Sequence, residues 1–516
     1  MTPESLCQSE AIAFLARPST YGSSVSAVEQ HETHGAIVFL AGDRAYKLKR
    51  AVHYPYMDYS SPEVRRAMCE AELAVNCRTA QQLYLDVLSI VREATGTLRF
   101  GARDEAASAV DWVVVMRRFP QRALLEQMRL HGQLTPPLMR NLAESIATFH
   151  MSAEVKREFG GAPGIQRVIE ENAAVLRSSQ GQFLGDRAVE VLDCGARRVL
   201  ADLAALLEER RTNGFVRRCH GDLHLNNICL LDGQPVLFDA VEFSEDFSCI
   251  DVLYDLAFLL MDLEHRGLRA FTNMVLNRYL EITRDYGGVA ALPLFLSCRA
   301  AIRAHVAGAL AENSTPAQAQ AVCSQAHALL REAIGYLSPA RPRLVVIGGL
   351  SGTGKTTVAR TLAPTIGKAP GAIVLRSDVI RKHLCGVPEL ERLPATRYDR
   401  ETTRRVYSAI AATAGLLLRG GHSVIADAVY GWPGERAEIE AAARNCGAAF
   451  LPIWLTAPVQ ILEERIGARR GDASDATVEV LHRQVESIEG PTDWHRVDAG
   501  GSEESSRSQL DPIVRA

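Results

Sequence analysis

Between about residues 35 and 120 the apolar positions come in short runs around one longer segment. Three of these runs are strand-like: Ala36–Leu40, Ala45–Lys49 and Val110–Met116. Gly42-Asp43, between the first two runs, has the composition of a hairpin turn. Pro62 to Leu83 has helical spacing, with Ser61 suited to the N-cap and Pro62 to the first helical position. We therefore expect short strands around one helix in this region.

From Pro136 onward the spacing of apolar residues becomes helical, as in Leu142–Phe149 and Ala188–Glu209. A segment of strands and loops, Val216 to Phe243, interrupts this pattern. Helical spacing then resumes from Val252 to about Tyr336. The first part of the chain is thus predicted to be an α+β fold with strands first and helices after.

A Pro-rich segment, Ser338–Arg343, precedes a region in which strand-like and helical runs alternate. Four of its runs are strand-like: Leu344–Ile347, Ala372–Leu375, Ser423–Ala426 and Ala449–Leu455. This alternation predicts an α/β fold, a parallel sheet with helices on both faces. The tail from Ala499 is rich in Ser, Glu and Gly, and we expect it to be disordered. We place the domains at residues 1–337 and 343–498, followed by a tail at 499–516.

The composition indicates which class of protein this is and which partners it does not favour. The 516 residues are 47% hydrophobic and 23% charged, as in soluble globular proteins of two or three domains. A net charge of -4 gives no overall attraction to nucleic acid or anionic membranes. The 11 cysteines include no C-x-x-C pair, which favours a reduced compartment, and MTPESLCQSE lacks the features of a secretory signal.

We therefore expect a cytoplasmic protein with neither a membrane nor nucleic acid as its partner. The longest apolar run, Val252 to Leu263, is broken by Asp255 and Asp262 and is too short to cross a bilayer. We expect it to be a buried helix. No feature of the sequence indicates an oligomeric state.

The run that follows the strand at Leu344–Ile347 fits the pattern G-x-x-x-x-G-K-[ST] in full. Its residues are Gly349, Leu350, Ser351, Gly352, Thr353, Gly354, Lys355 and Thr356. Glycines let backbone N–H groups turn toward phosphate oxygens, and the following helix adds its positive N-terminus. Lys355 is expected to reach the β/γ-phosphates and Thr356 to bind Mg²⁺. We predict that this loop, with Thr357 beside it, binds the phosphates of Mg-ATP.

Further polar residues follow the other strands of this region. Asp427 ends an apolar strand, as a Walker B carboxylate near Mg²⁺ would, although a simple strand-end turn has the same pattern. Asp378 is placed to accept a substrate hydroxyl proton and Arg381 to hold an anionic group of the substrate. The alternative for this pair is an N-cap with a solvated arginine. Arg465 and Arg469 suit a lid over the transferring phosphoryl group, or they complement a helix dipole.

An earlier segment carries a second phosphoryl-transfer constellation. Asp222 in the run Cys219 to Asn227 is followed five residues later by Asn227, and an apolar hairpin then leads to Asp239. This spacing matches the kinase template, in which Asp222 orients and deprotonates the acceptor hydroxyl and Asn227 and Asp239 hold Mg²⁺. We therefore predict a second nucleotide site in the first part of the chain.

A kinase of this kind needs a cation on the α/β-phosphates, held by a carboxylate from a helix. Lys47 and Lys49 share one face of a strand because side chains alternate with a period of two. The sequence leaves the choice between them open; we favour Lys47, with Glu72 as its partner. The alternative is an edge strand made soluble by its lysines.

These motifs resemble those of known families. HGDLHLNN and FDAVEF are similar to the catalytic loop and metal-binding segment of the aminoglycoside phosphotransferase and choline kinase group, over about residues 30 to 335. GLSGTGKT, RSDVIR, SVIADA and DASDA resemble small P-loop kinases of the gluconate kinase type and the ATP-binding domain fused behind aminoglycoside phosphotransferase-like domains, over about 343 to 494. The resemblance implies a protein-kinase-like fold first, a P-loop kinase fold second, an acceptor site at Asp378 and Arg381, and a lid at Arg465 and Arg469.

The sequence departs from these families in two ways. A G-x-G-x-x-G loop is missing between Arg17 and Gly35, and His305 stands where another basic residue is expected. We predict an ATP- and Mg²⁺-dependent phosphotransferase with two nucleotide sites, acting on hydroxyl groups of small metabolites. The alternatives are a regulatory ATP-binding protein with one inactive site, and polynucleotide 5′-hydroxyl kinase activity in the second domain.

Overall fold

The computed structural model of the protein describes residues 3–54, 57–105, 108–178, 184–312, 315–469 and 471–515. The chain forms two compact units. The first contains Met1–Val168 and Ala204–Asp262, and the second contains Ile169–Leu203 and Leu263–Ala516. Each unit holds one of the two predicted sites.

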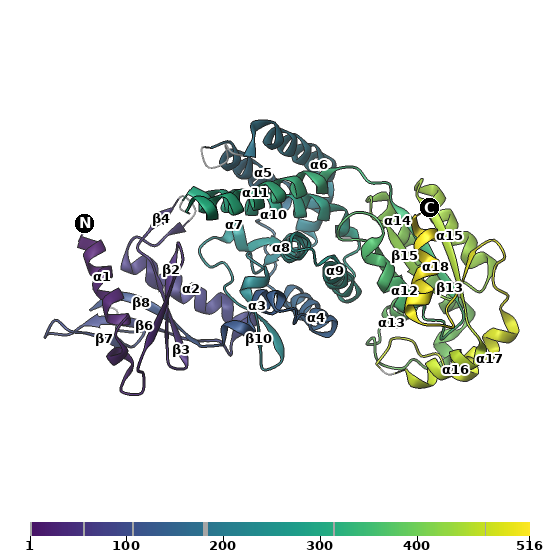
Figure 1. The fold of residues 1–516 in the computed structure, drawn as a ribbon, viewed down its shortest axis with the longest axis horizontal. Coiled ribbons are helices and arrows are strands. Elements are labelled where there is room, and N and C mark those ends of the chain that lie inside the picture. The colour runs from purple at the N-terminus through teal and green to yellow at the C-terminus, as the bar shows by residue number, and fades with distance from the viewer. Residues whose placement is uncertain are drawn as a thin grey trace. The chain divides into compact units, whose positions relative to one another are not determined.

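The first unit contains a six-stranded sheet with the order β1-β2-β3-β8-β6-β7, in which every pairing is antiparallel (Figure 1). Its strands are β1 (Val28–Glu32), β2 (Ala36–Ala41), β3 (Arg44–Lys49), β6 (Tyr84–Arg92), β7 (Leu98–Gly101) and β8 (Ala109–Arg117). The strands and the hairpin turn expected at residues 36–49 are confirmed. Helix α2 (Pro62–Ala80) begins as expected, because the Ser61 side chain accepts a hydrogen bond from the Val64 N–H.

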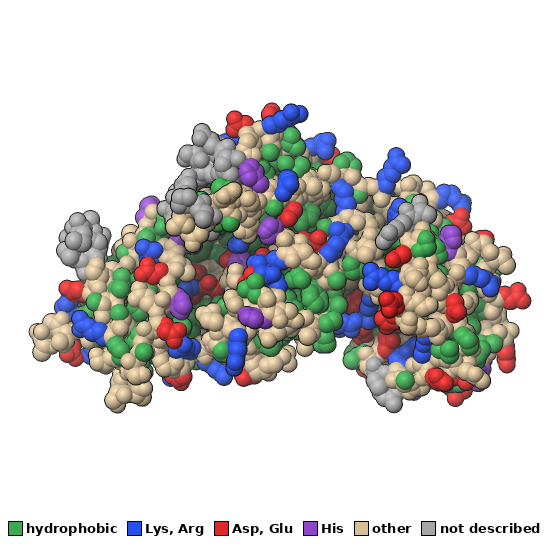
Figure 2. All heavy atoms as spheres, viewed as in Figure 1, with side chains coloured by type: hydrophobic (Ala, Val, Ile, Leu, Met, Phe, Trp, Pro, Cys, Tyr) green, Lys and Arg blue, Asp and Glu red, His purple; other side chains and the backbone are tan. Residues whose placement is uncertain are grey.

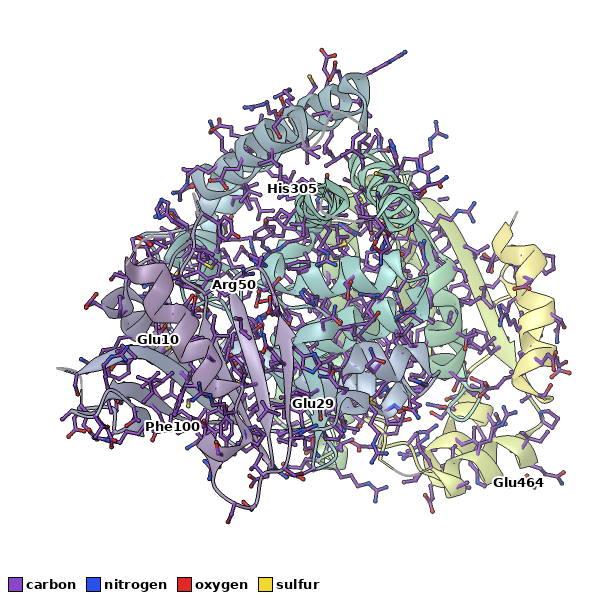
Figure 3. The ribbon with its side chains drawn as sticks, turned by 60° about the vertical axis from the view of Figure 1, so that its left-hand side comes forward. Glu10, Glu29, Arg50, Phe100, His305 and Glu464 are labelled. Atoms are coloured by element: carbon purple, nitrogen blue, oxygen red, sulfur yellow. The ribbon has the colours of Figure 1, made fainter. Side chains whose placement is uncertain are left out.

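Strand β8 has a nearly continuous apolar sequence because both faces of the sheet are covered. Val113 packs with Phe14 of helix α1 (Pro3–Leu15) on one face, whereas Val114 packs with Cys69 of α2 on the other. Phe100 lies on the α1 side (Figure 3), with its ring edge-on to Phe14 at a centroid separation of 5.2 Å. Helix α2 is thereby fixed against β3 and β8, which carry one of the sites.

The rest of the first unit is mainly helical. Its short strands are β4 (His53–Tyr54), β5 (Met57–Asp58), β9 (Val216–Arg218), β10 (Ile228–Leu231), β11 (Gln234–Leu237) and β12 (Cys249–Asp251). Its helices are α3 (Leu125–Leu130), α4 (Pro136–Ser152) and α7 (Glu245–Ser248). Three helices have residues in both units: α5 (Gly161–Arg177), α6 (Asp186–Thr212) and α8 (Val252–His265). The apolar run Val252 to Leu263 is buried throughout, as expected.

The second unit contains a five-stranded parallel sheet with the order β14-β15-β13-β16-β17. Its strands are β13 (Arg343–Gly349), β14 (Ile373–Arg376), β15 (Val424–Asp427), β16 (Ala449–Thr456) and β17 (His495–Asp498). The helices that follow the first strand are α12 (Lys355–Leu362), α13 (Ser377–Cys385), α14 (Arg400–Arg419), α15 (Pro433–Asn445), α16 (Val459–Ala468), α17 (Val478–Ser487) and α18 (Glu503–Arg515). The predicted parallel sheet is confirmed, and β17 is a strand that the sequence pattern did not indicate.

Three more helices belong to the second unit: α9 (Arg269–Thr283), α10 (Leu292–Glu312) and α11 (Pro316–Leu337). Among the described residues, one helical segment, Gly287–Gly308, is long and apolar enough to cross a membrane, and 67% of its apolar window is buried inside the protein. Helix α10 packs against α11. Most of its apolar surface therefore belongs to the protein core.

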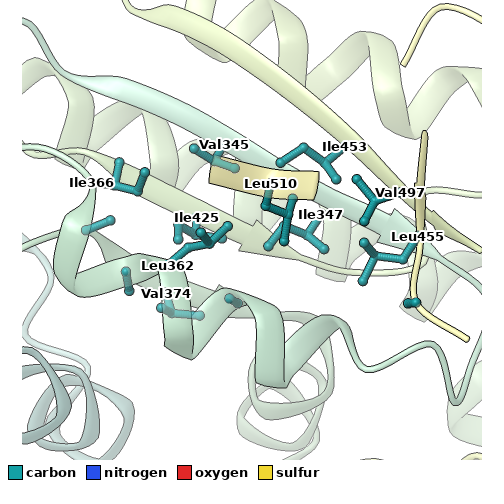
Figure 4. Packing of buried hydrophobic residues seen from close by; sticks show 14 residues of the cluster. Val345, Ile347, Leu362, Ile366, Val374, Ile425, Ile453, Leu455, Val497 and Leu510 are labelled. Atoms are coloured by element: carbon teal, nitrogen blue, oxygen red, sulfur yellow. The ribbon is translucent and has the colours of Figure 1, made fainter. Parts of the chain in front are cut away.

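The expectation of a disordered tail after Ala499 is wrong for the described residues, because Glu503–Arg515 forms helix α18. Leu510 is 2% exposed and packs in the core of the parallel sheet with Val497 and Leu362 (Figure 4). Burying a leucine side chain contributes about 1.5–3 kcal/mol. The polar composition of the tail did not reveal that its few apolar residues share one helix face.

Candidate active sites

The phosphate-binding loop lies between the end of β13 at Gly349 and the start of α12 at Lys355. Gly349 and Gly352 have φ angles of 141° and 87°, which favour glycine. A Cβ at Gly349 would lie 2.7 Å from the Leu455 carbonyl oxygen, and one at Gly352 would lie 2.8 Å from that of Leu462. These positions therefore require glycine for both backbone conformation and space.

Lys355 folds back over this loop. Its Nζ donates to the carbonyl oxygens of Gly349 and Leu350, each at 3.0 Å. Burial lowers the pKa of Lys355, although Asp427 and Asp378 oppose this effect. The Ser351 N–H donates to Oε1 of Gln484 on α17 at 2.9 Å. The Gln484 side-chain oxygen thus accepts a hydrogen bond from a loop N–H group that is suited to bind a phosphate oxygen. Sequence reasoning missed Gln484.

Thr356 and Asp427 meet at the C-terminal edge of the sheet. The Thr356 Oγ1 donates to the Asp427 Oδ2 at 2.6 Å, and Asp427 is 4% exposed at the end of β15. Burial raises the pKa of Asp427, whereas Lys355 and Arg376 act in the opposite direction. A hydroxyl and a carboxylate oxygen are ligands that Mg²⁺ accepts. The two residues therefore fit a magnesium site, and the ion would neutralise phosphate charge there.

A cavity of about 930 Å³ lies in front of the loop and joins the predicted donor and acceptor residues. The expected site residues that line it are Ser351, Gly352, Thr353, Gly354, Lys355, Thr356, Thr357, Asp378, Arg381, Asp427, Arg465 and Arg469. Its volume is typical of a small-molecule site. The fold thus brings the residues from separate strands to one pocket.

The acceptor side of this cavity is formed around Arg381. Its Nη1 donates to the Arg397 carbonyl oxygen at 3.1 Å and to Thr403 Oγ1 at 3.3 Å, and its guanidinium lies 4.7 Å from the ring centre of Tyr398. Trp432 also lines the cavity and is 55% exposed. Sequence reasoning missed both aromatic residues because they lie outside any motif.

The two arginines expected in a lid have different surroundings. Arg465 donates to the carbonyl oxygens of Ala499 and Gly501 at 2.8 and 3.2 Å, so the segment after β17 holds its side chain. Arg469 lies 3.7 Å from Asp472 in an ion pair. Asp472 in turn pairs with buried Arg376 at 2.8 Å. The two lid arginines therefore face the cavity from supports that the motifs did not reveal.

The first unit brings Lys47 of β3 to Glu72 of α2. The Lys47 Nζ lies 2.8 Å from Glu72 Oε1 and 2.5 Å from Asp239 Oδ1. Lys49, on the same face, pairs with Glu72 Oε2 at 2.6 Å and with Glu242. Burial disfavours ionisation of Glu72, but the two ammonium groups outweigh it and lower its pKa to about 2.

The structure separates the surroundings of the two lysines. The Lys49 side chain is 2% exposed between Glu72 and Glu242, whereas Lys47 is 16% exposed and its partner Asp239 is 42% exposed. Lys47 therefore joins the carboxylate of α2 to the open carboxylate expected to hold metal. Lys49 belongs to a buried ion cluster behind it.

We expect Lys49→Ala to destabilise the first unit by about 3–5 kcal/mol, because it leaves the Glu72 and Glu242 carboxylates buried without their shared cation. Lys47→Ala is expected to cost about 1 kcal/mol, since its partner Asp239 is partly solvated and Lys49 still neutralises Glu72. Hydrogen exchange of β3 and α2 peptides, followed by mass spectrometry, measures the difference. Equal loss of protection in both variants would contradict this assignment.

The catalytic-loop segment is held by hydrogen bonds to its own backbone. The Asn227 Nδ2 donates to the Asp222 carbonyl oxygen and to Asp222 Oδ2, both at 2.9 Å. Asp255 of α8 accepts from the backbone N–H groups of His220 at 3.0 Å and Gly221 at 2.8 Å. Burial lowers the pKa of His220 despite the nearby carboxylates. The Asp222 carboxylate is thereby fixed in orientation.

Asp239, one of the two residues expected to bind metal, lies beside Lys47. Asp239 has a φ of 62°, and its N–H donates to the Tyr84 hydroxyl at 3.2 Å. The Asn227 amide and the Asp239 carboxylate supply oxygen ligands suited to Mg²⁺. The structure therefore gathers the expected residues of the first site, namely Lys47, Glu72, Asp222, Asn227 and Asp239.

One buried cluster has the residue types of a metal site but another role. The ligand atoms of His150, Cys219 and Asp255 lie within 4.8 Å of one another. The Asp255 carboxylate accepts from the His220 and Gly221 N–H groups and contacts the His150 Nε2 at 3.1 Å. The Asp255 carboxylate is therefore engaged in hydrogen bonds that hold the loop carrying Asp222.

His305, the second departure in the sequence, lies on α10 (Figure 3). Burial lowers its pKa to about 4, so the imidazole is neutral at neutral pH. It therefore does not replace the basic side chain expected at this position.

The comparisons with known proteins match each half of the chain to a different family. Residues 69–292 match the Phosphotransferase enzyme family, and residues 344–491 match an AAA domain. An uncharacterized protein of Mycobacterium tuberculosis is 31% identical over 500 residues, which are 95% of this chain and 96% of that protein. The chain belongs to this two-domain family, which joins an aminoglycoside phosphotransferase-like domain to a P-loop kinase-like domain.

Two further proteins are each similar to one part of this chain. An adenylyl-sulfate kinase of Myxococcus xanthus is 35% identical over 117 residues, which are 23% of this chain and 59% of the kinase. A choline/ethanolamine kinase family protein from Mesorhizobium loti has a TM-score of 0.39 and 16% identity, covering 64% of this chain and 99% of that chain. The two family matches confirm both expected fold classes and make the protein an enzyme of the kinase class.

Proposed function

We propose that the protein is an Mg-ATP-dependent phosphotransferase with two active sites, each of which phosphorylates a hydroxyl group of a small molecule. The observation that carries this proposal is that each unit brings together a lysine, side-chain oxygens suited to Mg²⁺ and an aspartate. Phosphoryl transfer depends mainly on positioning and on neutralising charge, and both sets supply a lysine and metal-binding oxygens. In each set an aspartate is available to the acceptor hydroxyl.

In the second site, Lys355 and the loop amides bind the phosphates, while Thr356 and Asp427 hold Mg²⁺. Asp378, at the start of α13, accepts the proton of the acceptor hydroxyl. Arg469 neutralises charge on the transferring group from the other side of the cavity. In the first site, Lys47 and Asp222 have the corresponding roles, with Asn227 and Asp239 as metal ligands.

The lining of the second site supports an anionic acceptor. Two arginines, Arg381 and Arg392, and two aromatic residues, Tyr398 and Trp432, line the same cavity, and the Arg381 guanidinium lies over the Tyr398 ring. Guanidinium groups bind phosphate and sulfate groups, and exposed aromatic rings stack on planar groups. The similarity of this domain to adenylyl-sulfate kinases makes adenylyl sulfate the first acceptor to test.

We propose that the protein is cytoplasmic and that its partners are small molecules. The ten cysteines whose side chains are described are free. Figure 2 shows acidic and basic side chains interspersed over the visible face, in keeping with the net charge of -4. This mixture does not favour a nucleic acid or an anionic membrane as partner.

Incubation of the protein with Mg-ATP and a metabolite mixture is expected to produce compounds that gain one phosphoryl group, detected by mass spectrometry. Adenylyl sulfate is also assayed as a single acceptor. Gluconate, an acid that lacks a nucleobase, is assayed separately as the matched control. Stacking and charge together predict a kcat/KM for adenylyl sulfate at least about tenfold above that for gluconate. If no compound gains a phosphoryl group, the protein is a nucleotide-binding regulator and the proposal is wrong.

A further inference from the structure

Helix α9 lies along strand β14, the first strand in the order of the parallel sheet. The Asn273 Nδ2 donates to the carbonyl oxygens of Pro370 and Ala372, each at 3.0 Å. One turn later, Asn277 accepts from the Val374 N–H at 2.7 Å and donates to the Ala372 carbonyl oxygen at 3.1 Å. The helix thereby satisfies a backbone N–H of β14 and carbonyl oxygens of the residues just before it, at an edge that would otherwise be open to another strand.

Strand β14 ends at Arg376, directly before the helix that carries Asp378. Arg376 is 4% exposed, and its Nη2 pairs with Asp472 at 2.8 Å. Its Nη1 lies 3.5 Å from Glu389 and 3.8 Å from Glu281, and its Nε lies 3.9 Å from Asp427. One buried guanidinium therefore contacts the segment after the lid arginines, the acceptor-side loop, the Walker B carboxylate and helix α9.

Helix α9 supplies charge of both signs to this cluster. Glu281 faces Arg376, while Arg278 pairs with Glu281 at 3.1 Å and with Glu389. Glu281 is 7% exposed, so its charge is weakly screened by solvent. One of the four carboxylates around the Arg376 guanidinium thus lies outside the P-loop domain match, in the span matched by the phosphotransferase family.

We propose that helix α9 is a positioning element of the P-loop site and that Glu281 acts through Arg376. The attraction of Glu281 holds the guanidinium back from Asp427, which keeps the carboxylate oxygens available to Thr356 and to Mg²⁺. Without this charge, Arg376 pairs more closely with Asp427 and competes with the metal. This inference rests on the proposed nucleotide chemistry of the site. It makes the phosphotransferase-like part of the chain necessary for full metal affinity in the P-loop part.

The test uses the full chain with Asp239→Ala, which removes a metal ligand of the first site, as the parent. Binding of a fluorescent ADP analogue is titrated with Mg²⁺. Glu281→Gln is expected to raise the Mg²⁺ concentration at half-saturation about five- to tenfold, as coupling between neighbouring sites does. Glu281→Asp is expected to restore most of the parent value, because it keeps the charge.

A matched variant separates this role from a general loss of negative charge. Glu332→Gln removes a carboxylate of the same unit that pairs with His265 instead. It is expected to keep the parent's Mg²⁺ dependence. An unchanged half-saturation in Glu281→Gln, or an equal shift in Glu332→Gln, would overturn the positioning role. If the parent binds no nucleotide, both the inference and the proposed nucleotide site fail, whereas binding without turnover rejects only the proposed catalysis.

Discussion

Lys355→Ala is expected to lower phosphoryl transfer by the P-loop site about 10³-fold, or ~4 kcal/mol of transition-state stabilisation. The Nζ donates to the loop carbonyl oxygens of Gly349 and Leu350, and alanine has no charged group to take its place. Its loss also removes one of the two cations, Lys355 and Arg376, that favour the ionised form of Asp427. Initial rates of transfer to the acceptor found in the metabolite screen measure the effect.

The matched control is Lys368→Ala, which removes an exposed lysine of the same unit. Transfer by this variant is expected to stay within about twofold of the wild type, because surface substitutions away from a site have small effects. Each rate is compared with that of Lys355→Ala under saturating Mg-ATP. If Lys355→Ala retains more than a tenth of the wild-type rate, the loop does not carry the transfer.

Asp222→Asn is expected to lower transfer by the first site about 10²- to 10⁴-fold, the usual contribution of a positioned acid or base. The amide keeps an acceptor for the Asn227 Nδ2, which lies 2.9 Å from Asp222 Oδ2, so the loop stays folded. It loses the negative charge that orients the acceptor hydroxyl and takes its proton. The KM for ATP is expected to change little, because Lys47, the cation expected on the ATP phosphates, is held by Glu72 and Asp239 and keeps both partners.

Asp246→Asn provides the control, since this carboxylate pairs with Arg167 on the surface and both side chains are about half exposed. Combining Asp222→Asn with Lys355→Ala separates the two activities. If the two sites act on different acceptors, each substitution abolishes one product and spares the other. Loss of both products on either single substitution would show that the sites share one reaction.

The P-loop and its glycine geometry could be predicted from the sequence because the residues are consecutive. Residues Gly349 to Thr356 form one continuous loop, so their order in the sequence also sets which of them are neighbours in space. The backbone conformation and the close contacts require glycine at Gly349 and Gly352. The run from Asp222 to Asn227 is local in the same way. A motif of this kind is read directly from residue types and intervals.

Contacts between distant segments could not be predicted in this way. The alternation of side chains along β3 predicted that Lys47 and Lys49 share one face. Only the folded structure shows that Lys49 pairs with Glu242, which is 193 residues away in the chain. The Arg376 cluster joins Glu281, Asp427 and Asp472 from three separate elements. None of these partners has a sequence interval that marks it.

The sequence by itself determined the two kinase-like fold classes, α+β and α/β, and the two sets of residues proposed to bind phosphate and metal. The tertiary structure alone decided which lysine is buried, what supports the lid arginines, and that the polar tail is a helix anchored by Leu510. The physical reason is that residue type and local spacing fix what a side chain can bind. Burial and long-range ion pairs depend on which surfaces meet when the chain folds.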